Sequence, residues 1–243
     1  MNNFNIILLA FLAGLATVVG VFWGHHTHKN NRNIAFGTAF AAGMMILISF
    51  FELIPEAFKS INTKSFYWVF VGFLIIWVIN KILPHIHSVR AIEDCDQKCS
   101  LRLSYLLAIG LILHDFPEGF AIPSSFESSS KLGLFLVIAT FIHNIPEGYV
   151  LTVASAKYKS KGFFYKSALF SAASTMLGAI LGVTLTHYFS FLNPIFLAIA
   201  AGAMLFISFH ELIPTSLKND RKRVFATGAL SAVALFLILK IIF

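Results

Sequence analysis

Eight apolar stretches, each long enough to cross a lipid bilayer as a helix, dominate this chain of 243 residues. A helix needs about 20 residues to span roughly 30 Å of hydrocarbon. A chain that is 58% hydrophobic and only 12% charged cannot bury so much apolar surface in one soluble core. The apolar residues are continuous rather than alternating, which predicts helices and not a barrel. The sequence therefore predicts an all-α membrane protein, a single transmembrane domain over 1–243 with spans at about 4–24, 34–58, 66–84, 103–123, 132–156, 167–189, 194–217 and 224–243.

The basic residues indicate how the chain is oriented in the membrane. Thirteen of the eighteen Lys and Arg residues lie in the loops that begin near residues 25, 85, 157 and 218, whereas the opposite loops hold only Lys59, Lys64 and Lys131. Because cytoplasmic loops carry an excess of Lys and Arg, we expect both termini to lie outside. Basic clusters between apolar stretches orient a chain in a bilayer, so the net charge of +7 does not indicate nucleic-acid binding. The short loops suit a multi-pass protein of a bacterial cytoplasmic membrane.

One internal repeat joins the second and seventh stretches. Residues 43–55 read GMMILISFFELIP and residues 202–214 read GAMLFISFHELIP, which are identical at nine of thirteen positions. Met45 corresponds to Met204, and Glu52 corresponds to Glu211. The two stretches cross the membrane in opposite directions, so the repeat is inverted, as in many transporters.

A second repeat carries the metal-binding chemistry. HDFPEG at 114–119 and HNIPEG at 143–148 lie near the middle of neighbouring stretches. A His and a Glu four residues apart project from one helix face, so His114 with Glu118, and His143 with Glu147, each form half of a site. A short loop at about 124–131 would let the two halves face each other. Imidazole nitrogen and carboxylate oxygen are ligands for zinc and related divalent metals, and Asp115 and Asn144 add oxygen on the adjoining face.

Buried polar residues that only pair helix to helix are the simpler alternative for such side chains. However, six of the eleven acids lie within the spans, where an unpaired carboxylate costs at least about 2.5–3.5 kcal/mol. Lys81 and Lys240 lie near span ends, from which their side chains can reach the interface. We therefore expect the counter-charge to come from a metal cation or from protons.

These motifs resemble those of the ZIP (Zrt-/Irt-like) family of divalent-metal transporters, most closely its compact bacterial branch, over essentially the whole chain. The resemblance implies a bundle of three, two and three spans whose outer triplets are inverted, with a metal centre between the fourth and fifth spans. It implies that His114, Glu118, His143 and Glu147 are the primary ligands and that Asp115 and Asn144 help to form an adjacent second site. It also implies a thioether ligand at Met45, an outer entrance near Glu52, and an exit-side metal pair at His210 and Glu211.

The chain departs from the family pattern at two places. Asp115 stands where many relatives have Asn, and SAASTMLGA at 171–179 has Thr175 and Met176 where relatives often have Glu-Pro. The expected centre therefore holds one ion or two. Outside the spans, metal sensing or release is an alternative to a plain solvated loop for the residues His25, His26, His28, His85, His87, Cys95 and Cys99.

We expect a divalent-metal importer, with zinc as first substrate and iron, manganese, cobalt or cadmium as others. Zinc is then a bound substrate, and no prosthetic cofactor is expected. The partners are metal ions and the lipid bilayer, with a second copy of the chain as a candidate partner in a homodimer. The alternative is an intramembrane metal-dependent hydrolase or oxidase. Against that alternative, the sequence has no H-E-x-x-H pairing, and its acids extend from one membrane face to the other.

Overall fold

The computed structural model describes residues 2–27, 30–82, 97–155, 161–217 and 222–243, and these residues are almost entirely helical. Two π-helical turns, η1 and η4, and one short 3-10 turn, η3, interrupt or connect the helices. The elements in chain order are α1 (Asn3–His26), α2 (Asn31–Ile48), η1 (Ser49–Leu53), α3 (Ile54–Ile61), α4 (Lys64–Ile82), α5 (Gln97–Ser128), α6 (Ser130–Ser155), α7 (Lys161–Tyr188), η3 (Ser190–Leu192), α8 (Asn193–Ile207), η4 (Ser208–Leu212), α9 (Ile213–Ser216) and α10 (Lys222–Ile242).

The predicted all-α membrane fold is confirmed. Seven helical segments in the described part are long and apolar enough to cross a membrane, with α2–η1–α3 and α8–η4–α9 each forming one segment. The fourth predicted span, 103–123, is the one missing from these seven, and it lies within α5, which is longer than expected and carries one of the two His/Glu motifs. At about 1.5 Å per residue, α5 is long enough to cross the hydrocarbon. We count it as the eighth span.

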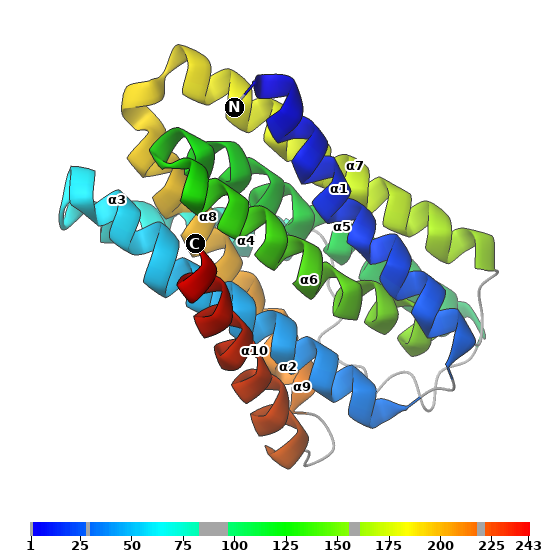
Figure 1. The fold of residues 1–243 in the computed structure, drawn as a ribbon. Coiled ribbons are helices and arrows are strands. Elements are labelled where there is room, and N and C mark those ends of the chain that lie inside the picture. Colours follow the sequence, from blue (N-terminus) through cyan, green and yellow to red (C-terminus); the bar gives the residue numbers. More distant parts are fainter. Residues whose placement is uncertain (1, 28–29, 83–96, 156–160, 218–221) are drawn as a thin grey trace.

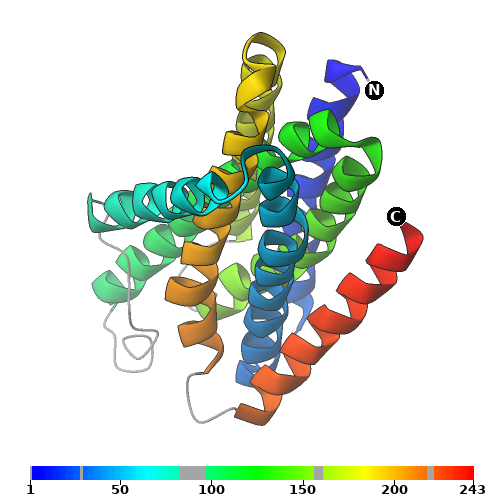
Figure 2. The ribbon, with the colours of Figure 1, turned by 90° about the vertical axis from the view of Figure 1, so that its left-hand side faces the viewer.

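The helices form a bundle whose contacts reflect the inverted repeat (Figure 1). α1 packs against α6 and α5 packs against α7, while α2 packs against α10 and α4 packs against α8. Figure 2 shows α2 and α8 side by side and running in opposite directions, with both chain termini toward the same end of the bundle. That end is called the terminal end below. The two outer triplets therefore run in opposite directions around the central pair α5 and α6.

Both copies of the first repeat contain a π-helical turn, which the sequence analysis did not predict. The backbone N–H of Ile54 bonds to the carbonyl of Ser49, and the N–H of Ile213 bonds to that of Ser208, five residues earlier in each case. Pro55 and Pro214 follow directly, and proline has no N–H and clashes with the carbonyl four residues before it. The wider turn accommodates the proline without ending the helix. The shared sequence thus produces the same local distortion twice.

Glycines bring the two motif helices into direct backbone contact with their neighbours. A methyl group at Gly119 of α5 would overlap the backbone of Thr175 in α7, and one at Gly178 of α7 would overlap the backbone of Phe116. The same reciprocal contact joins α6 to α1, where Gly148 meets Thr17 and Gly20 meets Ile145. Small residues allow close packing of membrane helices. Gly119 and Gly148 end the two PEG sequences, so these contacts position the motif helices directly.

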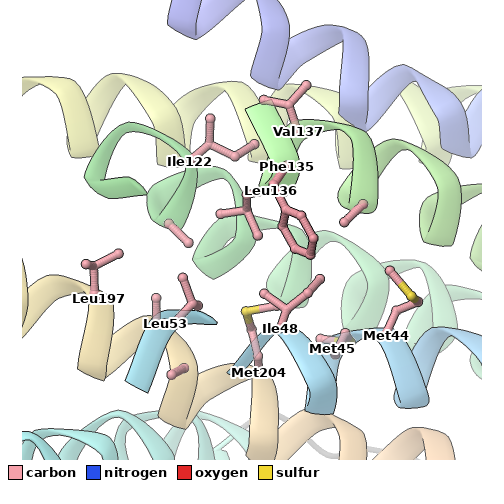
Figure 3. Close-up of a cluster of buried hydrophobic side chains, with 14 of the residues drawn as sticks. Met44, Met45, Ile48, Leu53, Ile122, Phe135, Leu136, Val137, Leu197 and Met204 are labelled. Atoms are coloured by element: carbon pink, nitrogen blue, oxygen red, sulfur yellow. The ribbon is translucent and has the colours of Figure 1, made fainter. Parts of the chain in front are cut away.

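A hydrophobic core fills the space between α2, α5, α6 and α8 (Figure 3). Its fully buried members include Met44, Met45, Ile48, Ile122 and Met204. By contrast, α4 and α10 are mostly exposed, and large apolar side chains such as Ile241 and Phe66 project outward from them. An apolar surface of this kind suits lipid, which agrees with the membrane assignment.

Candidate metal centre

The two HxxPEG motifs are brought together by a tight connection between α5 and α6. α5 ends at Ser128 and α6 begins at Ser130, so the loop predicted at about 124–131 is almost entirely helical. Ser129 alone separates the helices, and its hydroxyl oxygen accepts a hydrogen bond of 3.1 Å from the N–H of Leu132, a typical N-cap contact. The prediction of a loop was wrong, because one capping serine suffices to start the second helix. The prediction of adjacent, antiparallel motif helices was correct.

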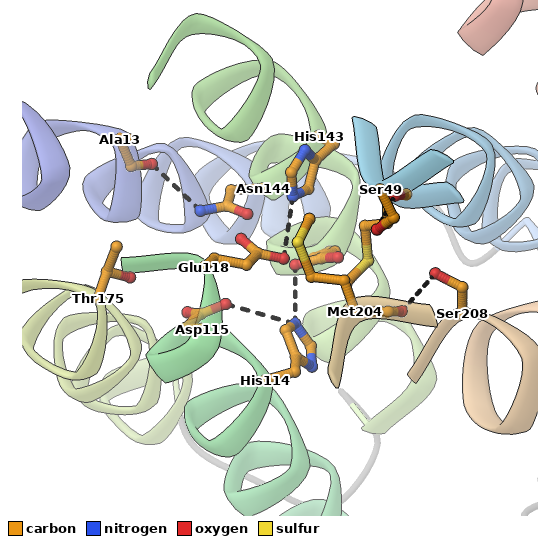
Figure 4. Close-up of polar contacts among 12 residues, drawn as sticks. Ala13, Ser49, His114, Asp115, Glu118, His143, Asn144, Thr175, Met204 and Ser208 are labelled. Atoms are coloured by element: carbon orange, nitrogen blue, oxygen red, sulfur yellow. Dashed lines mark hydrogen bonds and ion pairs between the residues drawn. The ribbon is translucent and has the colours of Figure 1, made fainter. Parts of the chain in front are cut away.

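Each histidine pairs with the glutamate of the other helix. His114 Nε2 of α5 lies 3.0 Å from Glu147 Oε2 of α6, and His143 Nε2 of α6 lies 3.2 Å from Glu118 Oε1 of α5. Side chains four residues apart lie side by side on one helix face. When two such helices run antiparallel, the histidine of one therefore meets the glutamate of the other (Figure 4). The expected half-sites face each other, but their pairs are crossed between the helices.

Two groups of three side chains could each hold a metal ion, and they share Glu147. One group is His114, Asp115 and Glu147, and the other is Glu118, His143 and Glu147. Within each group the candidate ligand atoms all lie within 4.8 Å of one another. Both groups combine imidazole nitrogen with carboxylate oxygen, a ligand set suited to zinc. The geometry is compatible with one ion that moves between the groups or with two ions bridged by Glu147.

These side chains are buried, yet some of their polar atoms have no partner in the described chain. The residues are between 0% and 7% exposed, and neither Glu118 Oε2 nor Glu147 Oε1 makes a hydrogen bond there. In the described part, the ion pairs of Asp115, Glu118 and Glu147 all involve histidine. Buried carboxylate oxygens without partners are costly. A divalent cation between the helices would satisfy them.

Asp115 and Asn144 lie beside the centre but are held in different ways. Asp115 Oδ1 is 3.4 Å from His114 Nε2, and its other oxygen accepts a hydrogen bond from the Ser171 hydroxyl of α7. The Asn144 side-chain amide donates to the carbonyl of Ala13 in α1 at 3.3 Å, which leaves Asn144 Oδ1 buried without a partner (Figure 4). Thr175 donates to the Ser171 carbonyl at 3.2 Å. Asp115 is therefore part of the first group of potential ligands, and Asn144 offers a neutral oxygen next to it.

His210 and Glu211 lie in η4, in the segment α8–η4–α9 that runs toward the end of the bundle opposite the termini (Figure 2). Asn80 of α4 lies between them and donates to Glu211 Oε1 at 3.4 Å, while its amide nitrogen is 3.3 Å from His210 Nδ1. A cavity of about 380 Å³ between α4, α5, α7 and α8 is lined by His114 at one place and by Asn80 and Glu211 at another. The rest of its lining is mainly apolar. The cavity thus extends from His114 to Asn80 and Glu211.

Glu52 has a basic partner, which contradicts one prediction from the sequence. Lys240 Nζ of α10 lies 2.6 Å from Glu52 Oε1, and on α3 Lys59 Nζ lies 2.6 Å from Glu56 Oε2. The expectation that these acids lack a counter-charge from the chain was wrong, because lysines near helix ends reach back to them. Glu52 lies in η1, and the segment α2–η1–α3 runs toward the terminal end of the bundle (Figure 2).

The remaining predicted residues are Met45 and the histidines and cysteines of the loops. Met45 is fully buried in the core, and its carbonyl accepts a hydrogen bond from the Ser49 hydroxyl at 2.8 Å. Of the loop residues proposed for metal sensing or release, His28, His85, His87, Cys95 and the side chain of Cys99 lie outside the described part of the chain. His25 and His26, at the end of α1, make aromatic contacts instead, with Phe164 and Phe22 respectively.

Sequence reasoning missed three contacts that residues outside the predicted site make with its side chains. Ser171 was noted only as part of the segment 171–179, yet it holds Asp115. Asn80 is one polar residue in an apolar stretch and becomes significant only next to Glu211. Lys240 is distant in sequence from Glu52, and its isolated positive charge near a span end was the available signal.

Comparison with known proteins identifies the family of the chain. A family model described as ZIP Zinc transporter matches residues 81–239. Proteins named Zinc transporter ZupT from Salmonella paratyphi A and Salmonella newport are 35% identical to the chain over 242 residues, which covers 94% of this chain and 93% of each relative. The Zinc transporter ZupT of Escherichia coli O7:K1 is 36% identical over 227 residues, covering 88% of this chain and 87% of that protein. The chain belongs to the ZIP family of transporters.

Proposed function

We propose that this protein imports zinc into the cytoplasm and that the ion binds between α5 and α6. Family membership makes the protein a membrane transporter and not an enzyme, so the metal-dependent hydrolase or oxidase is set aside. The proposed primary ligands are His114, Glu118, His143 and Glu147, with Asp115 and Asn144 beside them. The observation that carries the proposal is Glu147, a buried carboxylate shared by two groups of three potential ligands.

The proposed route runs from Glu52 through the centre to His210 and Glu211. Glu52 would concentrate cations at the terminal end, which the loop charges predict to face outward. The cavity that connects His114 with Glu211 supports release toward the opposite end. Carboxylates along such a path attract cations and hold them only transiently, which conduction requires. Transport would then proceed by alternating access or by a gated path, with residues 1–243 acting as one transport unit.

We propose zinc as the first substrate because the relatives carry that name and because the ligand set suits it. Iron, manganese, cobalt and cadmium are further candidates, since ligand type alone does not separate first-row divalent metals. The membrane would be the bacterial cytoplasmic membrane.

Uptake of radiolabelled zinc into proteoliposomes tests the proposal. The parent protein should accumulate zinc, and Glu147→Gln should abolish accumulation while the protein remains folded. Glu56→Gln is the matched control, because Glu56 also lies in a membrane-spanning segment but forms a peripheral ion pair with Lys59. Zinc uptake by Glu147→Gln equal to that of Glu56→Gln would refute the site. Absence of zinc uptake by the parent would refute the function.

A further inference from the structure

Met204 is one of two methionines that the inverted repeat duplicates, and the proposed function gives it no role. Met45 and Met204 occupy equivalent positions in the inverted repeat, and both are completely buried. The serine four residues after each one donates its hydroxyl to the methionine carbonyl at 2.8 Å, Ser49 to Met45 and Ser208 to Met204. The repeat has therefore preserved both the side chain and its local geometry.

The position of Met204 relates it to the metal centre. Figure 4 shows the Met204 side chain directed toward the space between His114, Glu118 and His143. α8 packs against α5, and Ala203 and Ile207, which flank Met204 on α8, line the same cavity as His114. The thioether thus lies on the α8 side of the centre (Figure 4).

Core packing is the competing explanation, because methionine fills irregular apolar gaps well. A comparison of the two copies of the repeat distinguishes a metal ligand from core packing. Met44 is equally buried in the same core, but its counterpart in the second copy is Ala203, so that position requires only an apolar residue. At the next position both copies retain methionine, although packing alone would accept Leu or Ile in its place.

We propose that Met204 is a thioether donor at the centre and that it favours soft cations over hard ones. This inference rests on the proposed function and adds to it a preference among substrates. Thioether sulfur binds soft ions, whereas manganese and magnesium prefer oxygen ligands. With Met45 in the first copy of the repeat and Met204 in the second, an ion would meet one sulfur on each half of the route. Manganese would be a poor substrate beside zinc and cadmium.

Competitive uptake tests the preference, with cadmium as the soft probe and manganese as the hard one. Met204→Leu keeps side-chain volume close to constant, and Met44→Leu is the matched control from the same core. In Met204→Leu the ratio of cadmium to manganese uptake should fall by at least about tenfold, the scale on which loss of a partner weakens metal affinity. Met44→Leu should keep the parent ratio. Equal ratios in the two variants, in a parent that transports zinc, would overturn the role of Met204 and leave the transport function standing.

X-ray absorption of cadmium-loaded protein tests the sulfur contact without transport. The chain has five methionines and two cysteines, so the measurement uses a Cys95→Ser/Cys99→Ser background. Sulfur scattering around cadmium should be present in this background and in Met44→Leu, and weaker in Met204→Leu. Identical sulfur scattering in Met44→Leu and Met204→Leu would overturn the inference, whether or not the parent transports metal.

Discussion

Replacement of Gly119 by alanine should disturb the metal centre without touching any ligand. A β-carbon at Gly119 would lie 2.6 Å from the Thr175 carbonyl carbon and closer still to its oxygen. Ordinary contact begins at 3.4 Å, so α5 and α7 would have to separate by more than 0.8 Å at this point, because the carbonyl oxygen is nearer than the carbon. The obstacle is backbone, which cannot rotate away as a flexible side chain would.

The size of the effect follows from the position of Gly119 beside Glu118. Binding groups must be held within about 0.5 Å of their productive geometry, and an error of about 1 Å can cost on the order of a hundredfold in activity. Overpacking of this kind also costs roughly 1–3 kcal/mol of stability. We therefore expect Gly119→Ala to weaken zinc binding by about ten- to a hundredfold and to lower the unfolding temperature.

Gly110→Ala is the matched control, because it makes the same chemical change on the same helix. No atom of the described chain outside the adjacent turns of α5 lies within 4 Å of a β-carbon at Gly110. Alanine is favoured over glycine in a helix by about 1 kcal/mol, so this variant should be as stable as the parent or slightly more stable, with unchanged zinc affinity. Calorimetric zinc titration and thermal unfolding of both variants in detergent provide the measurements. If Gly119→Ala matched Gly110→Ala in both, the glycine contact would not position the centre.

Three further predictions concern charge. Glu147→Gln should reduce equilibrium zinc affinity more than Glu118→Gln, because Glu147 belongs to both ligand groups and Glu118 to one; equal losses in calorimetry would argue against sharing. Zinc affinity should fall as the pH is lowered from about 7.5 to about 5.5, because imidazole binds metal only when neutral and carboxylate only when ionised; a flat calorimetric profile would count against histidine ligation. Lys240→Gln should lower the zinc concentration for half-maximal uptake, because Glu52 would lose its basic partner, whereas Glu211→Gln should lower the maximal rate by slowing release. Initial rates in proteoliposomes measure both constants, and parent-like constants in both variants would refute the proposed route.

The sequence was sufficient to predict apolar helices long enough to cross a membrane and the histidines and glutamates that meet between α5 and α6. Continuous apolar stretches require helices in a bilayer, because no water is present to satisfy an exposed backbone. The His and Glu of each motif are four residues apart, and helical geometry alone places them on one face. Their partners are on the next helix, so a short connection was enough to predict that His114, Glu118, His143 and Glu147 meet.

Only the tertiary structure decided how those residues pair and what surrounds them. The crossed pairs, such as His114 with Glu147, follow from the antiparallel register of α5 and α6, which spacing within one helix does not specify. The contacts of Ser171 with Asp115 and of Lys240 with Glu52 join residues far apart in the chain, and they depend on which helices become neighbours. Helix neighbours in a membrane are selected by close packing at small residues such as Gly119, and not by hydrophobicity, which is nearly uniform along these spans. Short segments of sequence therefore determine which polar side chains share one helix face. Packing between helices determines which residues those side chains contact.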